Sequence, residues 1–371
     1  MQETRILVIG GYGFFGRRLV ERLSLQSDLH IIVAGRSGAA AESLVGKLRP
    51  AATSQLSFAV VDAMHQAFAS EFKKLNVAVV VNASGPFQGE DYRVAGACIA
   101  AGAHYIDLAD GREFVAGIGT LNSAALKAGV LVTSGASSVP ALSSAVADHL
   151  VKGLQSVKTI DVGISPGNRT ERGLSTVRGI LSYCGKELPT SAGKPLVGWL
   201  NSYRHSYPDP VGSRLHSPCD VPDLALLPAR YAGHPEVRFG AGLELEFLHR
   251  GMNLMAWMAR HGQVKNWSAH AQWLKRAADL VQTWGTDAGA MHVAVSGIAP
   301  EGRTVSREWQ LVATHGDGPY VPTLAASALV RKLHLGGPAL AGAMPCVGLL
   351  TLEDFAREMQ GLKITTSETA Q

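Results

Sequence analysis

"VIGGYGFFGRRLVERL" (residues 8–23) decides the fold of the N-terminal part of the chain. An apolar run ends at Gly11 and a helical pattern begins at Gly16, so a glycine-rich turn joins a strand to a helix. Gly11, Gly13 and Gly16 have the spacing G-x-G-x-x-G. The first allows a tight turn, the second a close approach to a pyrophosphate, and the third close packing of helix on strand. The stretch therefore predicts dinucleotide binding.

Apolar runs alternate with helical patterns over the first 150 residues. The runs lie at 5–10, 30–35, 56–62, 76–84, 103–109 and 129–135. They are nearly continuous and rich in Val and Ile, which is typical of parallel strands buried on both faces. The fold class is therefore α/β, and residues 1–150 are predicted to form a doubly wound parallel sheet of the Rossmann type.

The pattern changes after about residue 155. Apolar runs at 157–165, 237–248, 291–298 and 303–314 predict a second sheet, whose last two strands form an antiparallel hairpin around "APEG". Residues 151–318 are interpreted as a substrate and dimerisation domain with a helical insert at 251–285. Residues 319–371 are expected to form C-terminal helices that return to the first domain, with a disordered end at "TTSETAQ".

Composition and charge exclude several classes of protein. The chain has 371 residues and a net charge of +4, and it lacks the Lys/Arg run of a nucleic-acid-binding segment. Its four cysteines are widely spaced and never form C-x-x-C, so neither a disulfide framework nor a metal site is expected. No apolar run reaches the roughly 18 residues that span a membrane, and the early first strand leaves no room for a signal peptide. We expect a cytoplasmic protein with a small-molecule substrate, assembled as a homodimer.

The end of the second predicted strand indicates which dinucleotide binds. An NAD site usually carries Asp or Glu there, about 20 residues after the glycines, to hold the ribose 2′-hydroxyl. Here the sequence reads Ala34-Gly35-Arg36-Ser37, without a carboxylate. Arg36 can hold a 2′-phosphate and stack on adenine, and Ser37 can add a hydrogen bond. NADP is therefore favoured over the alternative, in which Arg36 is a solvated arginine in an NAD site.

Two further segments complete the candidate cofactor site. Asp62 ends the third predicted strand, where it can hydrogen-bond adenine or cap the next helix. "SGPF" follows the fourth strand, opposite the glycine turn, where a nicotinamide ribose would lie; an ordinary Gly-Pro turn is the alternative. The candidate cofactor residues are Gly11, Tyr12, Gly13, Phe14, Phe15, Gly16, Arg36, Ser37, Asp62, Ser84, Gly85, Pro86 and Phe87.

Several segments together resemble the saccharopine dehydrogenase-like NADP-binding family. They are "VIGGYGFFGRRLVERL", "VAGRS", "VNASGPFQ", "AHYIDLADG", "SGASSVPALSSAVADHL" and "GDGPYVPTLAASALVRKL". The resemblance is strong over residues 1–150 and looser over 151–310. It implies a Rossmann domain, a second α/β domain built on a mixed sheet, and a C-terminal segment that returns to the first domain. It also implies hydride transfer between NADP(H) and a C=N or C=O carbon of a small amino-acid-like or polyamine-like substrate.

Four side chains in or just after the fifth predicted strand are candidates for proton transfer. They are Asp107, Asp110, Tyr105 and His104, which we expect on the ligand side of the sheet. Asp107 is favoured, because a carboxylate within an apolar strand is costly unless it is paired or functional. The alternatives are a core ring with a wet hydroxyl for Tyr105 and a packed histidine for His104.

Candidate substrate contacts lie in two loops. Ser137 follows the sixth strand, and capping of the next helix by Ser137 or Ser138 is the alternative to substrate contact. Asn168, Arg169 and Arg172 can clamp carboxylates of an amino-acid-like substrate, or they form a solvated surface loop. The Tyr-, His- and Arg-rich segment 203–238 is interpreted as a wet, basic lip.

Two functional alternatives stay open. The sequence offers no Tyr-x-x-x-Lys pair, which favours an NADP(H)-binding redox sensor or scaffold without turnover. The tryptophans of the insert, Trp257, Trp267, Trp273 and Trp284, are interpreted as core or dimer interface. If they instead form a lid, an apolar ketone or enoyl substrate becomes the alternative.

Overall fold

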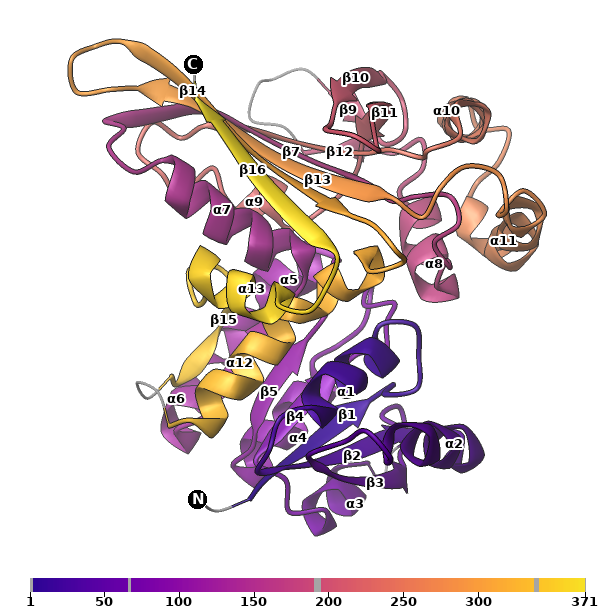
Figure 1. Ribbon diagram of the computed structural model, residues 1–371, viewed down its shortest axis with the longest axis vertical. Helices are drawn as coiled ribbons and strands as arrows, with labels where there is room; N and C mark the ends of the chain where they lie inside the picture. The colour runs from indigo at the N-terminus through magenta and orange to yellow at the C-terminus, as the bar shows by residue number, and fades with distance from the viewer. Residues whose placement is uncertain (1–2, 66–67, 190–194, 337–339, 371) are drawn as a thin grey trace. The chain divides into compact units, whose positions relative to one another are not determined.

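The computed structural model describes residues 3–65, 68–189, 195–336 and 340–370. They form two compact units, and Figure 1 traces the chain through them from indigo to yellow. Unit 1 contains Met1–Ala141 and Tyr320–Glu358, and unit 2 contains Leu142–Pro319 and Met359–Gln371. Each unit is built around its own seven-stranded sheet.

The sheet of unit 1 is parallel throughout. In spatial order its strands are β15 (Gly342–Pro345), β6 (Leu131–Ser134), β5 (His104–Asp107), β4 (Val79–Asn82), β1 (Thr4–Ile9), β2 (Leu29–Gly35) and β3 (Gln55–Val60). Apart from β15, this is the strand order 3-2-1-4-5-6 of dinucleotide-binding folds. β2 and β4 are buried at every position, as expected for strands between two layers of helices. The predicted doubly wound sheet is confirmed.

Helices connect these strands, and part of the unit comes from the end of the chain. The helices are α1 (Gly16–Ser24), α2 (Gly38–Leu48), α3 (Phe68–Lys74), α4 (Arg93–Ala101), α5 (Arg112–Gly117), α6 (Asn122–Ala128), α12 (Leu324–His334) and α13 (Leu352–Met359). α12 lies against α1, and β15 extends the sheet by pairing with β6. The Ser327 hydroxyl of α12 donates to the buried Glu358 carboxylate of α13 at 2.7 Å, which ties these two helices together.

The sheet of unit 2 is mixed. Its strands are, in order, β10 (Tyr203–Ser206), β11 (Ser213–Pro218), β12 (Glu236–Ala241), β7 (Ser156–Ser165), β13 (Gly289–Ile298), β14 (Thr304–Ala313) and β16 (Ile364–Ala370). β12 runs parallel to β7, whereas the other neighbouring strands pair antiparallel. The expected second sheet and the hairpin of β13 and β14 are both confirmed.

The remaining elements of unit 2 are mostly short. They are α7 (Ser143–Leu150), α8 (Leu174–Ser182), the strand pair β8 (Glu187–Leu188) and β9 (Leu196–Val197), α9 (Asp223–Leu226), α10 (Glu246–Arg260) and α11 (Ala271–Asp279). α7 lies on β13 and β14. Among the described residues, no helix is long and apolar enough to cross a membrane.

The prediction of a disordered C-terminus is wrong. Ile364–Ala370 form β16, which pairs antiparallel with β14 along its whole length, from Ala313 opposite Ile364 to Arg307 opposite Ala370. The segment is polar because it is an edge strand with most side chains exposed. Its hydrogen-bonding partner lies about fifty residues earlier in the chain, so local composition gave no indication of it.

Candidate active site

The glycine turn after β1 leaves backbone donors free at the start of α1. The Gly13 N–H donates to the Gly10 carbonyl at 2.8 Å, and the Arg17 N–H donates to the Gly13 carbonyl at 3.0 Å. Within the described part of the chain, the N–H groups of Phe14, Phe15 and Gly16 have no acceptor. The first turn of α1 also lacks acidic residues. Free N–H groups at a helix N-terminus form a binding site for an anion such as pyrophosphate.

Close backbone packing explains the glycines of this turn. A Cβ on Gly16 would lie 2.1 Å from the Gly10 carbonyl oxygen, so only glycine fits where α1 begins. Gly10, which the sequence analysis missed, has φ +72° and lies against the backbone of Ala83 and Ser84. The turn is thereby held between β1 and the loop after β4. In the sequence, the double glycine "GG" at 10–11 is the feature that could have indicated this contact.

Tyr12 connects the glycine turn to the end of β2. Its ring lies over Gly35, where a Cβ would come within 2.5 Å of the ring, and its hydroxyl accepts a hydrogen bond from the Ser37 N–H at 2.9 Å. The Ser37 hydroxyl caps α2 by accepting from the Ala40 N–H. Arg36 is exposed between them and forms no hydrogen bond or ion pair with any described residue. Arg36 and Ser37, the residues predicted to bind the 2′-phosphate, are therefore both exposed, and the Arg36 side chain gives this position a positive charge.

Asp62 does not cap the following helix. Its carboxylate accepts a hydrogen bond from the Met64 N–H at 3.0 Å, which closes a local turn, and the described part of α3 starts at Phe68. The side chain is exposed. Of the two predicted roles, the cap is therefore wrong, and adenine contact stays a prediction.

The loop after β4 combines an exposed serine with a buried ring. Ser84 donates through its hydroxyl and its N–H to the buried Asn82 side chain, at 2.5 and 3.1 Å. Asn82 in turn donates to the Tyr105 hydroxyl at 3.3 Å. Phe87 is buried against Phe114, whereas Gly85 and Pro86 are partly accessible. Ser84, Gly85 and Pro86 can therefore face a nicotinamide, while Phe87 supports the loop from beneath.

Asp107 is fully buried at the end of β5, where it links two loops. One carboxylate oxygen accepts hydrogen bonds from the N–H of Ala109 at 3.0 Å, the N–H of Gly135 at 2.9 Å and the Ser134 hydroxyl at 2.9 Å. Burial raises the pKa of Asp107 to about 6, although these donors favour the ionised form. The geometry suits a group that positions the loops after β5 and β6.

His104 does not lie on the ligand side of the sheet, contrary to expectation, and Tyr105 is buried. His104 is the first residue of β5, at the amino end of the strand, and its ring nitrogen accepts a hydrogen bond from the Leu131 N–H at 2.9 Å. Burial lowers the pKa of His104. Tyr105 belongs to the hydrophobic core, and burial raises the pKa of its hydroxyl well above the ordinary value. The packed histidine, which the sequence left as the alternative for His104, is what the structure shows. The Tyr105 ring lies in the core, as its alternative stated, but its hydroxyl is buried, so the expected wet hydroxyl is wrong.

Asp110, which lies just beyond β5, is a partly accessible carboxylate at this edge. It is partly exposed and accepts a hydrogen bond from the Gln88 amide at 3.0 Å, which joins the loops after β4 and β5. The carboxyl ends of parallel strands meet at one edge of the sheet. Asp110 therefore lies with Ser84 on the edge that carries the glycine turn.

Ser137 and Ser138 are buried and do not cap α7. The Ser137 N–H donates to the Gly135 carbonyl at 2.8 Å. An irregular turn at Ser138–Leu142 intervenes before α7, whose N-cap is Leu142 without a side-chain hydrogen bond. The capping interpretation is therefore wrong, and substrate contact by Ser137 stays a prediction.

In unit 2, the predicted clamp residues bind another segment of their own unit. The buried Asn168 amide donates to the carbonyls of Val281 and Trp284, both at 2.7 Å, and its oxygen accepts from Arg172. Arg172 lies 3.9 Å from Asp279, and the Arg169 guanidinium donates to the Thr283 carbonyl. The Asn168 amide group therefore makes its hydrogen bonds within unit 2, and the interpretation of a solvated surface loop is wrong for this residue. Contact of Arg169 and Arg172 with a substrate stays a prediction.

The segment 203–238 contributes to a buried polar network on one face of the unit 2 sheet. His292 of β13 is fully buried beneath the stacked His205 ring, 3.6 Å between centroids, and its Nδ1 is 2.7 Å from the Tyr207 hydroxyl. The same hydroxyl is 2.9 Å from Nε2 of the buried His216. Burial lowers the pKa of His216 to about 3 and also lowers that of His292. The interpretation of a wet lip is therefore wrong for these rings.

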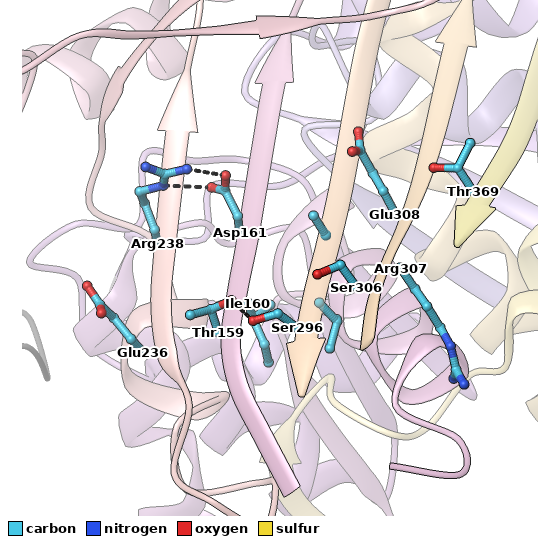
Figure 2. Close-up of a pocket in the computed structure, with 12 residues that line it drawn as sticks. Thr159, Ile160, Asp161, Glu236, Arg238, Ser296, Ser306, Arg307, Glu308 and Thr369 are labelled. Carbon is cyan, nitrogen blue, oxygen red and sulfur yellow. Dashed lines mark hydrogen bonds and ion pairs between the residues drawn. The ribbon is translucent and has the colours of Figure 1, made fainter. Parts of the chain in front are cut away.

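A polar hollow of about 460 Å³ adjoins this network (Figure 2). Figure 2 shows Arg238 of β12 and Asp161 of β7 side by side, joined by two hydrogen bonds. Glu308 of β14 lines the same hollow and pairs with His205 at 3.0 Å. Asp161 and Glu308 are therefore both paired with cationic or basic side chains, and the pKa of each carboxyl is lowered despite its burial.

Comparison with known proteins agrees with this geometry. Residues 6–149 match the family model described as the saccharopine dehydrogenase NADP binding domain. The parallel sheet, its glycine turn and this match support an NAD(P)-dependent oxidoreductase. More particularly, this match confirms, over residues 6–149, the resemblance of the N-terminal motifs to the saccharopine dehydrogenase-like NADP-binding family.

One solved structure shares the fold over nearly the whole chain. Apo saccharopine dehydrogenase (L-Glu forming) from Saccharomyces cerevisiae aligns with a TM-score of 0.68 at 12% identity, covering 99% of this chain and 100% of that chain. A probable dehydrogenase from Thermotoga maritima has a TM-score of 0.46 at 11% identity, covering 96% of this chain and 93% of that chain, which is too low a score to support an inference. No curated protein matches the chain significantly.

Proposed function

We propose that this protein is an NADP(H)-dependent oxidoreductase that transfers a hydride between the cofactor and a C=N or C=O carbon of a small amino-acid-like or polyamine-like substrate. The observation that carries the proposal is the sheet edge of unit 1. There, free N–H groups at the start of α1 adjoin an exposed Arg36 and a β2 end without a carboxylate. A dianionic 2′-phosphate suits this position better than a ribose hydroxyl.

Each loop at this edge has a part in binding the cofactor. The N–H groups of Phe14, Phe15 and Gly16 hold the pyrophosphate, and Arg36 holds the 2′-phosphate. Tyr12 fixes the spacing between these two anion sites through its contact with Ser37. Ser84 and the Gly85-Pro86 turn face the nicotinamide ribose. When bound, NADPH supplies the hydride.

The loops after β5 and β6 orient the acceptor and its proton. Asp107 positions them by binding the N–H groups of Ala109 and Gly135. Asp110 exchanges the proton of the acceptor at the ligand edge, where the Gln88 amide donates a hydrogen bond to its carboxylate. For an imine substrate, this carboxylate also attracts the cationic nitrogen that the C=N group carries when protonated.

Turnover with pooled substrates tests the proposal. The purified protein receives NADPH with amino acids plus 2-oxo acids, then NADPH with polyamines plus aldehydes, and NADPH absorbance is followed. We expect consumption that depends on one pool and is slower with NADH. Tight NADPH binding without turnover in any pool contradicts the oxidoreductase and favours a sensor or scaffold. Absence of NADPH binding contradicts both.

A further inference from the structure

Large apolar side chains are exposed in one short part of unit 2. The described chain has twelve exposed large hydrophobic residues, and six of them lie between 247 and 284. Trp273 is 69% exposed, Leu280 83% and Trp284 58%. A core role for the tryptophans of this segment is therefore wrong for Trp257, Trp273 and Trp284. Exposed apolar patches of this kind mark interaction surfaces.

The exposed residues of α10 lie on one face of the helix. Phe247, Leu254 and Trp257 are spaced by seven and three residues, and all three are exposed, whereas His249 and Ala256 on the opposite face are buried. Arg250 lies on the exposed face as well. α10 is thus amphipathic, with an apolar stripe on its solvent side and a guanidinium beside it.

The segment of α11 has a second stripe of the same composition. This stripe consists of Trp273, Leu280 seven residues later, and Trp284 another four residues later. The exposed Arg276 lies between Trp273 and Leu280 in the sequence. The rings of Phe247 and Trp284 are 6.0 Å apart, so the two stripes meet. We call the six apolar residues Phe247, Leu254, Trp257, Trp273, Leu280 and Trp284 the aromatic stripe.

The charge around the aromatic stripe is positive. Residues 246–285 contain the five cations Arg250, Arg260, Lys265, Lys275 and Arg276, and the two acids Glu246 and Asp279. Glu246 pairs with Arg204 at 2.9 Å and with Arg250 at 3.4 Å, and Asp279 pairs with Lys275 at 2.6 Å. Arg260 pairs with Glu187, outside the segment, at 2.7 Å. Arg276 has no ion-pair partner among the described residues.

We propose that the aromatic stripe docks the protein onto the surface of a bilayer that contains anionic phospholipid. Trp, Phe and Leu side chains insert at the boundary between headgroups and acyl chains, where Trp is enriched in membrane proteins. Arg250 and Arg276 then meet lipid phosphates, and the surplus positive charge of the segment favours an anionic leaflet. The helices lie in the interface plane and do not span it. This inference is independent of the proposed oxidoreductase activity.

Vesicle binding tests the proposal. The full chain is floated with vesicles of phosphatidylcholine alone and with vesicles containing phosphatidylglycerol, while its tryptophan fluorescence is recorded. Binding to the anionic vesicles, with a blue shift of the fluorescence, is expected. The double substitution Trp273→Ser and Leu280→Ser should weaken binding by about tenfold or more, because both residues insert. Arg276→Glu should weaken it by about fivefold at low salt and by less at high salt.

The matched control replaces two other exposed leucines, which lie outside the stripe. Leu25→Ser with Leu335→Ser changes two exposed side chains of unit 1 and should leave vesicle binding unchanged. The proposal is overturned if the wild type binds neither vesicle, or if the control loses as much binding as Trp273→Ser with Leu280→Ser. It is also overturned if the wild type self-associates in sedimentation without binding vesicles and the stripe variant does not, since a second copy of the chain then covers the stripe.

Discussion

The hydroxyl oxygen of Tyr12 lies 2.9 Å from the backbone nitrogen of Ser37, and the hydrogen bond between them joins the glycine turn to the end of β2. The Tyr12 ring reaches Ser37 by crossing Gly35, which leaves room for it because it has no Cβ. A cofactor site that binds pyrophosphate at one end and a ribose phosphate at the other needs a fixed distance between the two. In the proposed cofactor site, Tyr12 sets that distance.

Gly35→Ala should therefore weaken cofactor binding. The new Cβ would lie 2.5 Å from the Tyr12 ring, so either the ring or the turn must move. We expect the dissociation constant for NADPH to rise by about tenfold, equivalent to about 1.4 kcal/mol, in a fluorescence titration. Gly46→Ala in α2 is the matched control, since its Cβ meets nothing within 4 Å. Equal affinities in the two variants would contradict the role given to Tyr12.

Arg36→Ala should change cofactor preference. A hydrogen bond to a charged group contributes about 1.5–3 kcal/mol, so NADPH affinity should fall by about tenfold to a hundredfold, while NADH affinity stays the same. Arg49→Ala, which removes another exposed arginine at the end of α2, controls for loss of positive charge. If Arg36→Ala binds NADPH as tightly as the wild type, the assignment of NADP from Arg36 is wrong.

Periodic and local features of the fold could be predicted from the sequence. Continuous Val/Ile runs identified β1, β2 and β4, because strands buried on both faces need apolar residues at every position. The hairpin of β13 and β14 followed from two strand patterns around a short turn. Gly16 was identified because the G-x-G-x-x-G spacing involves only neighbouring residues, and this spacing places a glycine at the start of a helix.

Features that depend on distant partners could not be predicted. Asn168 and Arg172 were chosen for their chemistry, but their partners at 279–284 lie more than a hundred residues away. The polar strand β16 resembles a disordered tail until β14 provides its hydrogen bonds. His104 was correctly predicted to lie on a strand, but its position within that strand was wrong. The ends of predicted strands are uncertain by several residues, and β5 is only four residues long.

Substitutions at Asp107 distinguish a positioning role from a catalytic one. Asp107→Ala leaves the N–H groups of Ala109 and Gly135 without their acceptor, and we expect a loss of about 2–4 kcal/mol in urea unfolding. Asp107→Asn keeps an acceptor oxygen and should lose less than half as much, with NADPH affinity within about twofold of the wild type. If Asp107→Asn instead folds normally, binds NADPH and abolishes turnover, the carboxylate takes part in proton transfer directly.

The buried histidines should make unit 2 sensitive to acid, and His216 offers the clearest test. Burial lowers its pKa in the folded protein to about 3, whereas an unfolded histidine has a pKa of about 6.5. The stability contributed by the neutral ring is therefore complete above about pH 6.5 and is lost as the pH falls through 6.5 toward 3. Between pH 7 and 4.5, His216→Gln should reduce the acid-induced loss in free energy of unfolding by about 2–3 kcal/mol.

Urea unfolding at pH 7, 5.5 and 4.5 measures this slope. The amide introduced by His216→Gln would keep a polar contact for the Tyr207 hydroxyl, so the comparison concerns the change with pH and not the stability at one pH. His270→Gln is the control, because its exposed ring meets water in both states and should leave the slope as in the wild type. Identical slopes in the wild type and His216→Gln would show that His216 gains its proton without unfolding, and that the network around Tyr207 can accommodate the charge.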